Sequence, residues 1–208
     1  MSPETTALVR IAAALGADAG FAGESIADAV TAARDAAGPV AIREVLLQSV
    51  LFVGYPKVLN AFIAWRSVSE AAGSASHEES VPGDALAAWE QRGRDVLATV
   101  YGDQHEQVVA NVQALDADLA RWMVVDGYGK VLGRPGLPLG VRELCIVAIL
   151  ARQDVPRQLY SHLRGALNAG VPVHDIEETL AIANSGMTAT RSARAIEVWR
   201  TVRNRRGE

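Results

Sequence analysis

Apolar residues recur three and four positions apart over most of the chain, which is the period of a helix with one buried face. The clearest example is a face formed by Ile42, Val45, Leu46, Ser49, Val50 and Val53. We find no convincing stretch in which apolar and polar residues alternate, as a half-buried strand requires. The pattern therefore predicts an all-α fold.

Glycine and proline mark the ends of the predicted helices. Gly54 and Tyr55 interrupt one helix, and Pro56 suits the first position of the next. Residues 126–138 are so rich in glycine and proline that we expect an ordered loop, and Asp84 is expected to be an N-cap. The predicted helices cover residues 4–15, 24–37, 42–53, 56–65, 84–100, 104–124, 141–152, 156–169, 174–184 and 188–204.

The chain divides into two predicted helical units. The small, polar and acidic segment 73–83 reads as a linker between unit 1–72 and unit 84–208. The order of elements after the linker repeats the order before it, since LVRIAAAL (8–15) matches LCIVAILA (144–151) and AIREVL (41–46) matches DIEETL (175–180). This loose similarity suggests an internal duplication.

Composition narrows the class of protein. Half of the 208 residues are apolar and 21% are charged, which is usual for a packed globular protein, and the net charge of −4 gives no reason to expect nucleic acid. Cys145 is the single cysteine, so an intramolecular disulfide is impossible. We see no signal peptide and no run of about 18 apolar residues, so we expect a cytoplasmic protein without a membrane span.

The stretch RELCIVAILARQDVPRQLYSHLRGALNAGVPVHDIEETL (142–180) resembles the core of carboxymuconolactone decarboxylase and alkyl hydroperoxidase D-like proteins. That core reads Arg-Glu-Leu, an apolar helix, and then His-x-x-x-Ala-Leu-x-x-Gly. Two upstream segments, WEQRGRDVLATVYGD (89–103) and GYGKVLGRPGLPLGVREL (127–144), resemble the decarboxylase branch, and REVLLQSVLFVGYPKVLNA (43–61) resembles a later piece of the family. The resemblance implies an alkyl hydroperoxidase D-like helical bundle.

Departures from the family pattern restrict the chemistry. Peroxidase members carry Cys-x-x-Cys, whereas the equivalent positions here are about Val155 and Gln158. The single thiol, Cys145, is flanked by apolar residues and has no second cysteine with which to form a disulfide. Reduction of peroxide by a thiol mechanism is therefore not expected. The first unit has Ala7 near the family's glutamate position and Asp28 near its histidine position, so we expect it to supply helices and pocket walls.

Glu143 and His162 are the candidate catalytic residues. They stand 19 positions apart on two predicted helices joined by a tight turn, so antiparallel packing can bring them together. A carboxylate beside an imidazole orients the ring and assists proton transfer near neutral pH. The alternative is a buried polar contact that only holds two helices together.

Three further residues are candidate substrate ligands. Arg134 has a guanidinium that can bind a substrate carboxylate in a bidentate fork, although a solvated loop arginine is the alternative. Tyr128 and Tyr160 are candidates for the pocket lining, or else half-buried core residues. Arg142 is expected to be an ion-pair partner.

The resemblance to the decarboxylase implies a cofactor-free lyase or isomerase that acts on a small carboxylated lactone or cyclic substrate. His162, held by Glu143, would be its general acid/base, with no metal and no organic cofactor. The alternative is a non-catalytic binding or scaffold protein of the same fold. Since members of this class assemble through helical faces, we expect a homo-oligomer, a trimer or another ring.

Overall fold

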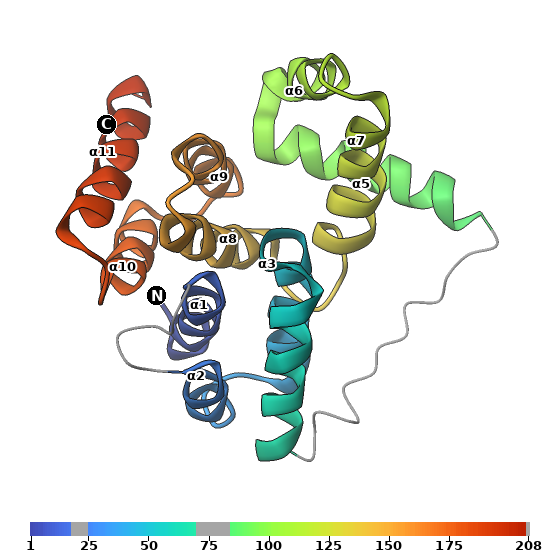
Figure 1. Cartoon of the computed structure of the whole chain (residues 1–208). Helices are drawn as coiled ribbons and strands as arrows, with labels where there is room; N and C mark the ends of the chain where they lie inside the picture. Colours follow the sequence, from blue (N-terminus) through green and yellow to red (C-terminus); the bar gives the residue numbers. More distant parts are fainter. Residues whose placement is uncertain (18–24, 70–83, 207–208) are drawn as a thin grey trace.

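The computed structural model describes residues 1–17, 25–69 and 84–206, and all regular structure within these ranges is helical (Figure 1). The all-α prediction is therefore confirmed. The elements are α1 (Pro3–Gly16), α2 (Ile26–Ala33), α3 (Pro39–Val68), α5 (Ala85–Tyr101), the 3₁₀ turn η1 (Gly102–Gln104), α6 (His105–Gln113), α7 (Ala117–Trp122), the π-helix η2 (Met123–Leu132), α8 (Leu139–Gln153), α9 (Pro156–Asn168), α10 (Val173–Asn184) and α11 (Ala189–Arg206). The predicted linker 73–83 lies outside the described residues.

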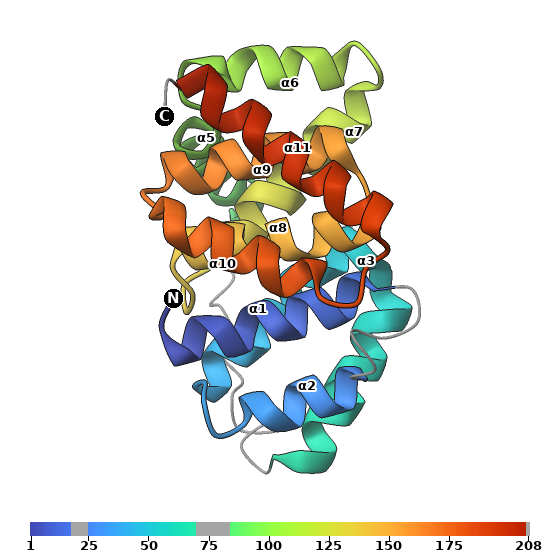
Figure 2. The same cartoon turned by 90° about the vertical axis from the view of Figure 1, so that its left-hand side faces the viewer.

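Helix α8 is the centre of the protein. Every residue from Arg142 to Arg152 is buried, because α8 is surrounded by α1, α3, α9 and α10 (Figures 1 and 2). Its almost continuous apolar sequence is typical of a helix that is buried on all sides. The two charged residues at the start of this buried run, Arg142 and Glu143, therefore need partners inside the protein.

Helix α1 joins the N-terminal part of the chain to this core. It crosses α8 so closely that a Cβ on Gly16 would lie 2.8 Å from the Cα of Ile149. At its C-terminal end, Nζ of Lys57 donates to the carbonyl oxygens of Leu15 and Ala17 at 3.4 and 2.8 Å. Buried apolar side chains from before and after residues 70–83 form one continuous core.

Helix α3 bends at the predicted break. Gly54 has φ 74° and ψ 169°, which a side chain would disfavour, and Pro56 follows it. By length and composition α3 is apolar enough to cross a membrane, with an 18-residue window of mean hydropathy 1.4 that is 28% buried. The sequence predicts no such segment, because it has no run of about 18 apolar residues. Its first half carries the buried polar residues Glu44 and Gln48, so this half is part of the protein core.

The prediction of a loop over residues 126–138 is wrong in its first part, because Met123–Leu132 forms a π-helix. Within this π-helix, Gly129 allows close packing against α5 and does not form a turn. A Cβ on Gly129 would lie 2.0 Å from the carbonyl oxygen of Trp89 in α5, and a Cβ on Gly93 would lie 2.0 Å from the carbonyl oxygen of Val124. The two helices therefore touch backbone to backbone.

The single helix predicted over residues 104–124 is also wrong. The chain leaves the helix after α6, and Asp116 adopts an extended conformation in which its side chain accepts from the Leu119 N–H and caps α7. Asp84 precedes α5 as predicted, but its side chain makes no capping hydrogen bond.

Candidate active site

Glu143 and His162 lie face to face between α8 and α9. The distance from Nδ1 of His162 to Oε2 of Glu143 is 2.8 Å. The side chain of Glu143 is completely buried and that of His162 is 8% exposed. The structure thus brings the two candidate catalytic residues into direct contact inside the protein.

The turn between the two helices explains this juxtaposition. Asp154 ends α8 in the left-handed conformation, with φ 57° and ψ 48°, and Pro156 begins α9. The Asp154 carboxylate also accepts from the Arg194 guanidinium at 2.7 Å, which fixes the turn against α11. The two helices then pack against each other, so that the second turn of α8 meets the middle of α9.

The other oxygen of the Glu143 carboxylate, Oε1, is buried and has no hydrogen-bond partner among the described residues. Space beside this carboxylate is tight, since a Cβ on Gly165 would lie 3.0 Å from Oε2. A buried carboxylate oxygen without a partner costs free energy, and such atoms often have a functional role. One oxygen of the carboxylate thus contacts the imidazole, and the other has capacity for a further hydrogen bond.

Helix α3 supplies a wall of this site. The ring of Phe52 meets the imidazole of His162 edge to face, with centroids 5.9 Å apart. Gln153 fixes the Phe52 backbone by donating from Nε2 to its carbonyl oxygen at 2.8 Å. The sequence alone does not identify Phe52 as a site residue, because its contact with His162 depends on how α3 packs against the α8–α9 pair.

Tyr128 lies in η2 and pairs with Tyr101 of α5. Their hydroxyl groups are 2.8 Å apart. Burial raises the pKa of Tyr128 well above its usual value, and the Tyr101 and Glu143 charges act in the same direction. Burial likewise raises the pKa of Tyr101. Both phenols therefore remain protonated at neutral pH. The negative charge of Glu143 lies close enough to raise the pKa of each.

Arg134, the candidate carboxylate anchor, is bound to a carboxylate of the protein itself. Its Nε lies 3.1 Å from Oε2 of Glu44, which is 1% exposed. Glu44 also accepts from Arg142 at 2.9 Å and from Arg43 at 3.1 Å. This cluster fastens the chain segment before α8 to α3, and it leaves 15% of the Arg134 side chain exposed.

Arg142 makes the predicted ion pair and further contacts. Its guanidinium also donates to Gln48 Oε1 at 3.2 Å and to the Arg134 carbonyl oxygen at 3.0 Å. Burial lowers its pKa, and the bond to Glu44 opposes this effect. The sequence signal for the Glu44 cluster was the pair of polar residues Glu44 and Gln48, one turn apart within an apolar helix.

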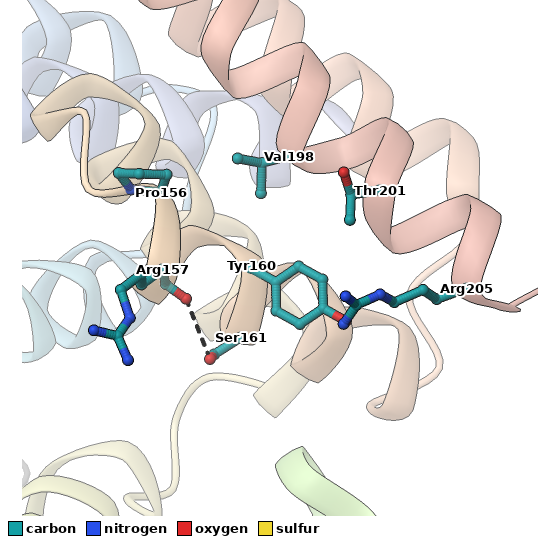
Figure 3. A pocket seen from close by; sticks show the side chains of 7 residues that line it. All are labelled: Pro156, Arg157, Tyr160, Ser161, Val198, Thr201 and Arg205. Atoms are coloured by element: carbon teal, nitrogen blue, oxygen red, sulfur yellow. Dashed lines mark hydrogen bonds between the residues drawn. The ribbon is translucent and has the colours of Figure 1, made fainter.

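Tyr160 lies away from the Glu143–His162 pair. It is two residues before His162 on α9, a separation of about 200° around a helix. Its hydroxyl accepts from the Arg205 guanidinium at 3.0 Å, and its ring contacts Arg164 and Arg205. The structure therefore places Tyr160 in a groove between α9 and α11 (Figure 3).

Cys145 follows Glu143 by two residues but belongs to the core. It is a free and fully buried thiol, and burial raises its pKa to about 12. It is therefore protonated at neutral pH and is neither a nucleophile nor a ligand in that form. Within residues 1–17, 25–69 and 84–206, no group of three or more His, Cys, Asp or Glu side chains is arranged to hold a metal ion.

The N-terminal part contains no second pair at the positions suggested by the repeat. Ala7 is buried in α1, and Asp28 is exposed and forms a capping box with Ser25 at the start of α2. The contacts around α1 resemble those around α8, since α1 packs on α2 and α3 while α8 packs on α9 and α10. The duplication itself remains a prediction.

Comparison with known proteins identifies the family of this chain. The sequence model of the carboxymuconolactone decarboxylase family matches residues 118–200, which include both Glu143 and His162. Peroxisomal protein 2 of Schizosaccharomyces pombe is 31% identical over 144 residues, which are 68% of this chain and 66% of that protein. The 4-carboxymuconolactone decarboxylase of Acinetobacter baylyi is 27% identical over 106 residues, or 50% of this chain and 79% of that enzyme. The chain belongs to the carboxymuconolactone decarboxylase family.

Proposed function

We propose that this protein is a lyase or isomerase in which His162, oriented by Glu143, transfers a proton to or from a small carboxylated lactone or cyclic substrate. The observation that carries the proposal is the 2.8 Å contact between Nδ1 of His162 and a fully buried carboxylate. This contact fixes the orientation of the ring and leaves Nε2 as the nitrogen for a substrate. No metal and no organic cofactor is needed for such a step.

For a decarboxylation the balance of the step is simple. The bond between the ring carbon and the substrate carboxylate breaks, carbon dioxide leaves, and the electron pair passes into the conjugated carbonyl system. The carbon on which the pair finally resides takes one proton from His162, and water returns a proton to the imidazole. Glu143 stabilises the imidazolium before the proton is given up and again after water has returned it, because opposite charges attract strongly in a buried site.

The position of Phe52 supports this assignment. The edge-to-face contact places an apolar ring beside the imidazole, which keeps water away from part of the reacting region. The relative from Acinetobacter baylyi is named for activity on a carboxylated lactone. We extend that substrate class to this chain as part of the proposal.

A non-catalytic binding protein is the second candidate function. The observation in its favour is that Arg134 is already bound to Glu44, so a substrate carboxylate must compete with an internal one. Under this alternative, carboxylated ligands would stabilise the protein without being converted.

The test is turnover of a panel of carboxylated lactones and cyclic acids, including 4-carboxymuconolactone, by three proteins. We expect wild-type protein to release carbon dioxide and His162→Gln to lose about 100-fold or more of the rate, the scale of general acid/base catalysis. His174→Gln is the control, because His174 is 75% exposed and contacts its neighbour Asp175 at the surface. Equal rates for His162→Gln and wild type, or ligand-induced thermal shifts without any product, would contradict the catalytic proposal.

A further inference from the structure

We propose that the groove between α9 and α11 binds an organic anion, a molecule with an apolar body and a carboxylate or phosphate group. This site is separate from the Glu143–His162 pair, because it is on the opposite side of α9, where Tyr160 points toward α11 (Figure 3). The inference does not depend on the proposed function.

The groove has the size and lining of a small-molecule site. Its volume is 580 Å³, within the range of about 300–1,000 Å³ that is usual for ligand pockets. Apolar atoms come from Pro156, Val198 and the Tyr160 ring, and hydroxyl groups come from Ser161 and Thr201. The apolar body of a ligand can therefore pack against the apolar side chains, and the hydroxyl groups can orient it by hydrogen bonds.

A second pocket adjoins the groove and carries the positive charge. It has a volume of 210 Å³ and shares Tyr160 and Arg205 with the larger groove. Its remaining lining residues are Gln104, Arg164, Val202 and Arg206. A ligand whose body lies along Val198 can thus place its charged end among three guanidinium groups.

These three arginines have only neutral partners among the described residues. Arg164 donates to Oε1 of Gln104 at 3.0 Å and Arg205 donates to the Tyr160 hydroxyl at 3.0 Å. Arg206 donates to the side-chain oxygen of Asn168. Three like charges in one small pocket repel each other, and an anion between them would remove that repulsion.

Other arginines of α11 have carboxylate partners. On the same helix, Arg200 pairs with Glu197 at 2.7 Å and Arg203 pairs with Glu177 at 3.1 Å. The chain as a whole carries a net charge of −4, so acidic side chains outnumber basic ones. Among the described residues, the three arginines of the pocket beside Tyr160 thus differ from Arg200 and Arg203 in having neutral partners.

Helical periodicity explains how the sequence builds this site. Val198, Thr201 and Arg205 are three and four residues apart on α11, and Pro156, Tyr160 and Arg164 are four apart on α9. Each set therefore lies on one face of its helix, and the two faces are opposed across the groove. His162 is outside the α9 set and faces α8 instead.

Calorimetric titration of the full-length protein with four probes tests the ligand class. We expect phenyl phosphate, benzoate or both to bind at least about tenfold more tightly than benzyl alcohol, which lacks the charge, as expected for charge-assisted hydrogen bonds. Inorganic phosphate, which lacks the apolar body, should also bind more weakly. Equal affinity for benzyl alcohol, or for inorganic phosphate, would overturn the proposed ligand class.

Matched variants test the place of binding. Arg205→Gln should weaken binding of the tighter probe by about tenfold, because it removes a charged donor, whereas Arg200→Gln on the same helix should leave it unchanged. His162→Gln should also bind the probe like wild type, whatever its turnover. Equal affinities for Arg205→Gln and Arg200→Gln, or loss of binding in His162→Gln, would overturn the proposed location.

Discussion

At the scale of single residues, charged side chains inside the core determine what the protein can do. Arg142 and Glu143 are adjacent on α8 but point to different helices, Arg142 to Glu44 of α3 and Glu143 to His162 of α9. The first pair fastens the elements together, and the second is the candidate catalytic pair. The sequence indicated the second pair through its spacing, whereas the role of Glu44 depends on packing across 98 positions.

Replacing Glu44 with Ala should destabilise the protein strongly. Three arginines contact this carboxylate, and Arg142 would remain buried without its ionic partner. We expect a loss of about 3–5 kcal/mol in the free energy of unfolding, as for other broken buried ion pairs. Urea unfolding measures it, with Glu90→Ala as the control, because Glu90 pairs with Arg94 on the surface and should cost less than about 1 kcal/mol.

Cys145 should not react in the folded protein. Burial raises the pKa of its thiol from 9.0 to about 12 in the folded state, so the thiol stays protonated at neutral pH. Because the unfolded thiol ionises at lower pH than the folded one, the folded state loses stability only as the pH rises from about 9 toward 12. We expect no labelling by a disulfide reagent at pH 8 until guanidinium unfolds the chain, and no reduction of hydrogen peroxide. Rapid labelling of the native protein would show that the thiol is accessible.

At the scale of elements, helices with a clear apolar face were predictable and irregular ones were not. Helices α8 to α11 match their predicted ranges closely, because glycine or proline separates strongly periodic segments. The sequence does not predict the π-helix η2, because its glycines favour a loop, whereas Gly129 is in fact required for the close contact with α5. The prediction of one helix over residues 104–124 is wrong because Asp116 is extended and caps a new helix, α7.

Gly129→Ala should disrupt the contact between η2 and α5. The added methyl would lie 2.0 Å from the Trp89 carbonyl oxygen, so backbone must move, and we expect a loss of about 2 kcal/mol or more. Gly127→Ala in the same π-helix is the control, because its nearest neighbour would be 3.8 Å away. Thermal unfolding compares the two variants, and equal melting temperatures would contradict the close contact.

At the scale of the whole molecule, the parts of the chain before and after residues 70–83 share one core, and the candidate site uses both. Glu143 and His162 come from the later part, whereas Phe52 comes from the earlier one. The sequence predicted the fold and the pair. It did not show which residues of α3 would meet them, because that depends on how helices distant in sequence pack.

The second half of α3 leads us to expect self-association. Tyr55, Leu59 and Ile63, which follow the bend at Gly54, are spaced four apart and are 69%, 57% and 67% exposed. Such a stripe is usual where another apolar surface packs, and we propose that copies of this chain meet there in a trimer or another ring. Light scattering should give a multiple of 22.1 kDa that falls in Leu59→Glu. A wild-type monomer would contradict this proposal.

The most direct test of the acid/base account is a double-mutant cycle on the candidate pair. The steady-state rate of carbon dioxide release would be measured for wild type, Glu143→Gln, His162→Gln and the double variant. If Glu143 acts only through His162, the double variant will be no slower than His162→Gln alone, because residues that work as a unit are not additive. If the two losses instead multiply, Glu143 and His162 act independently and the account is wrong.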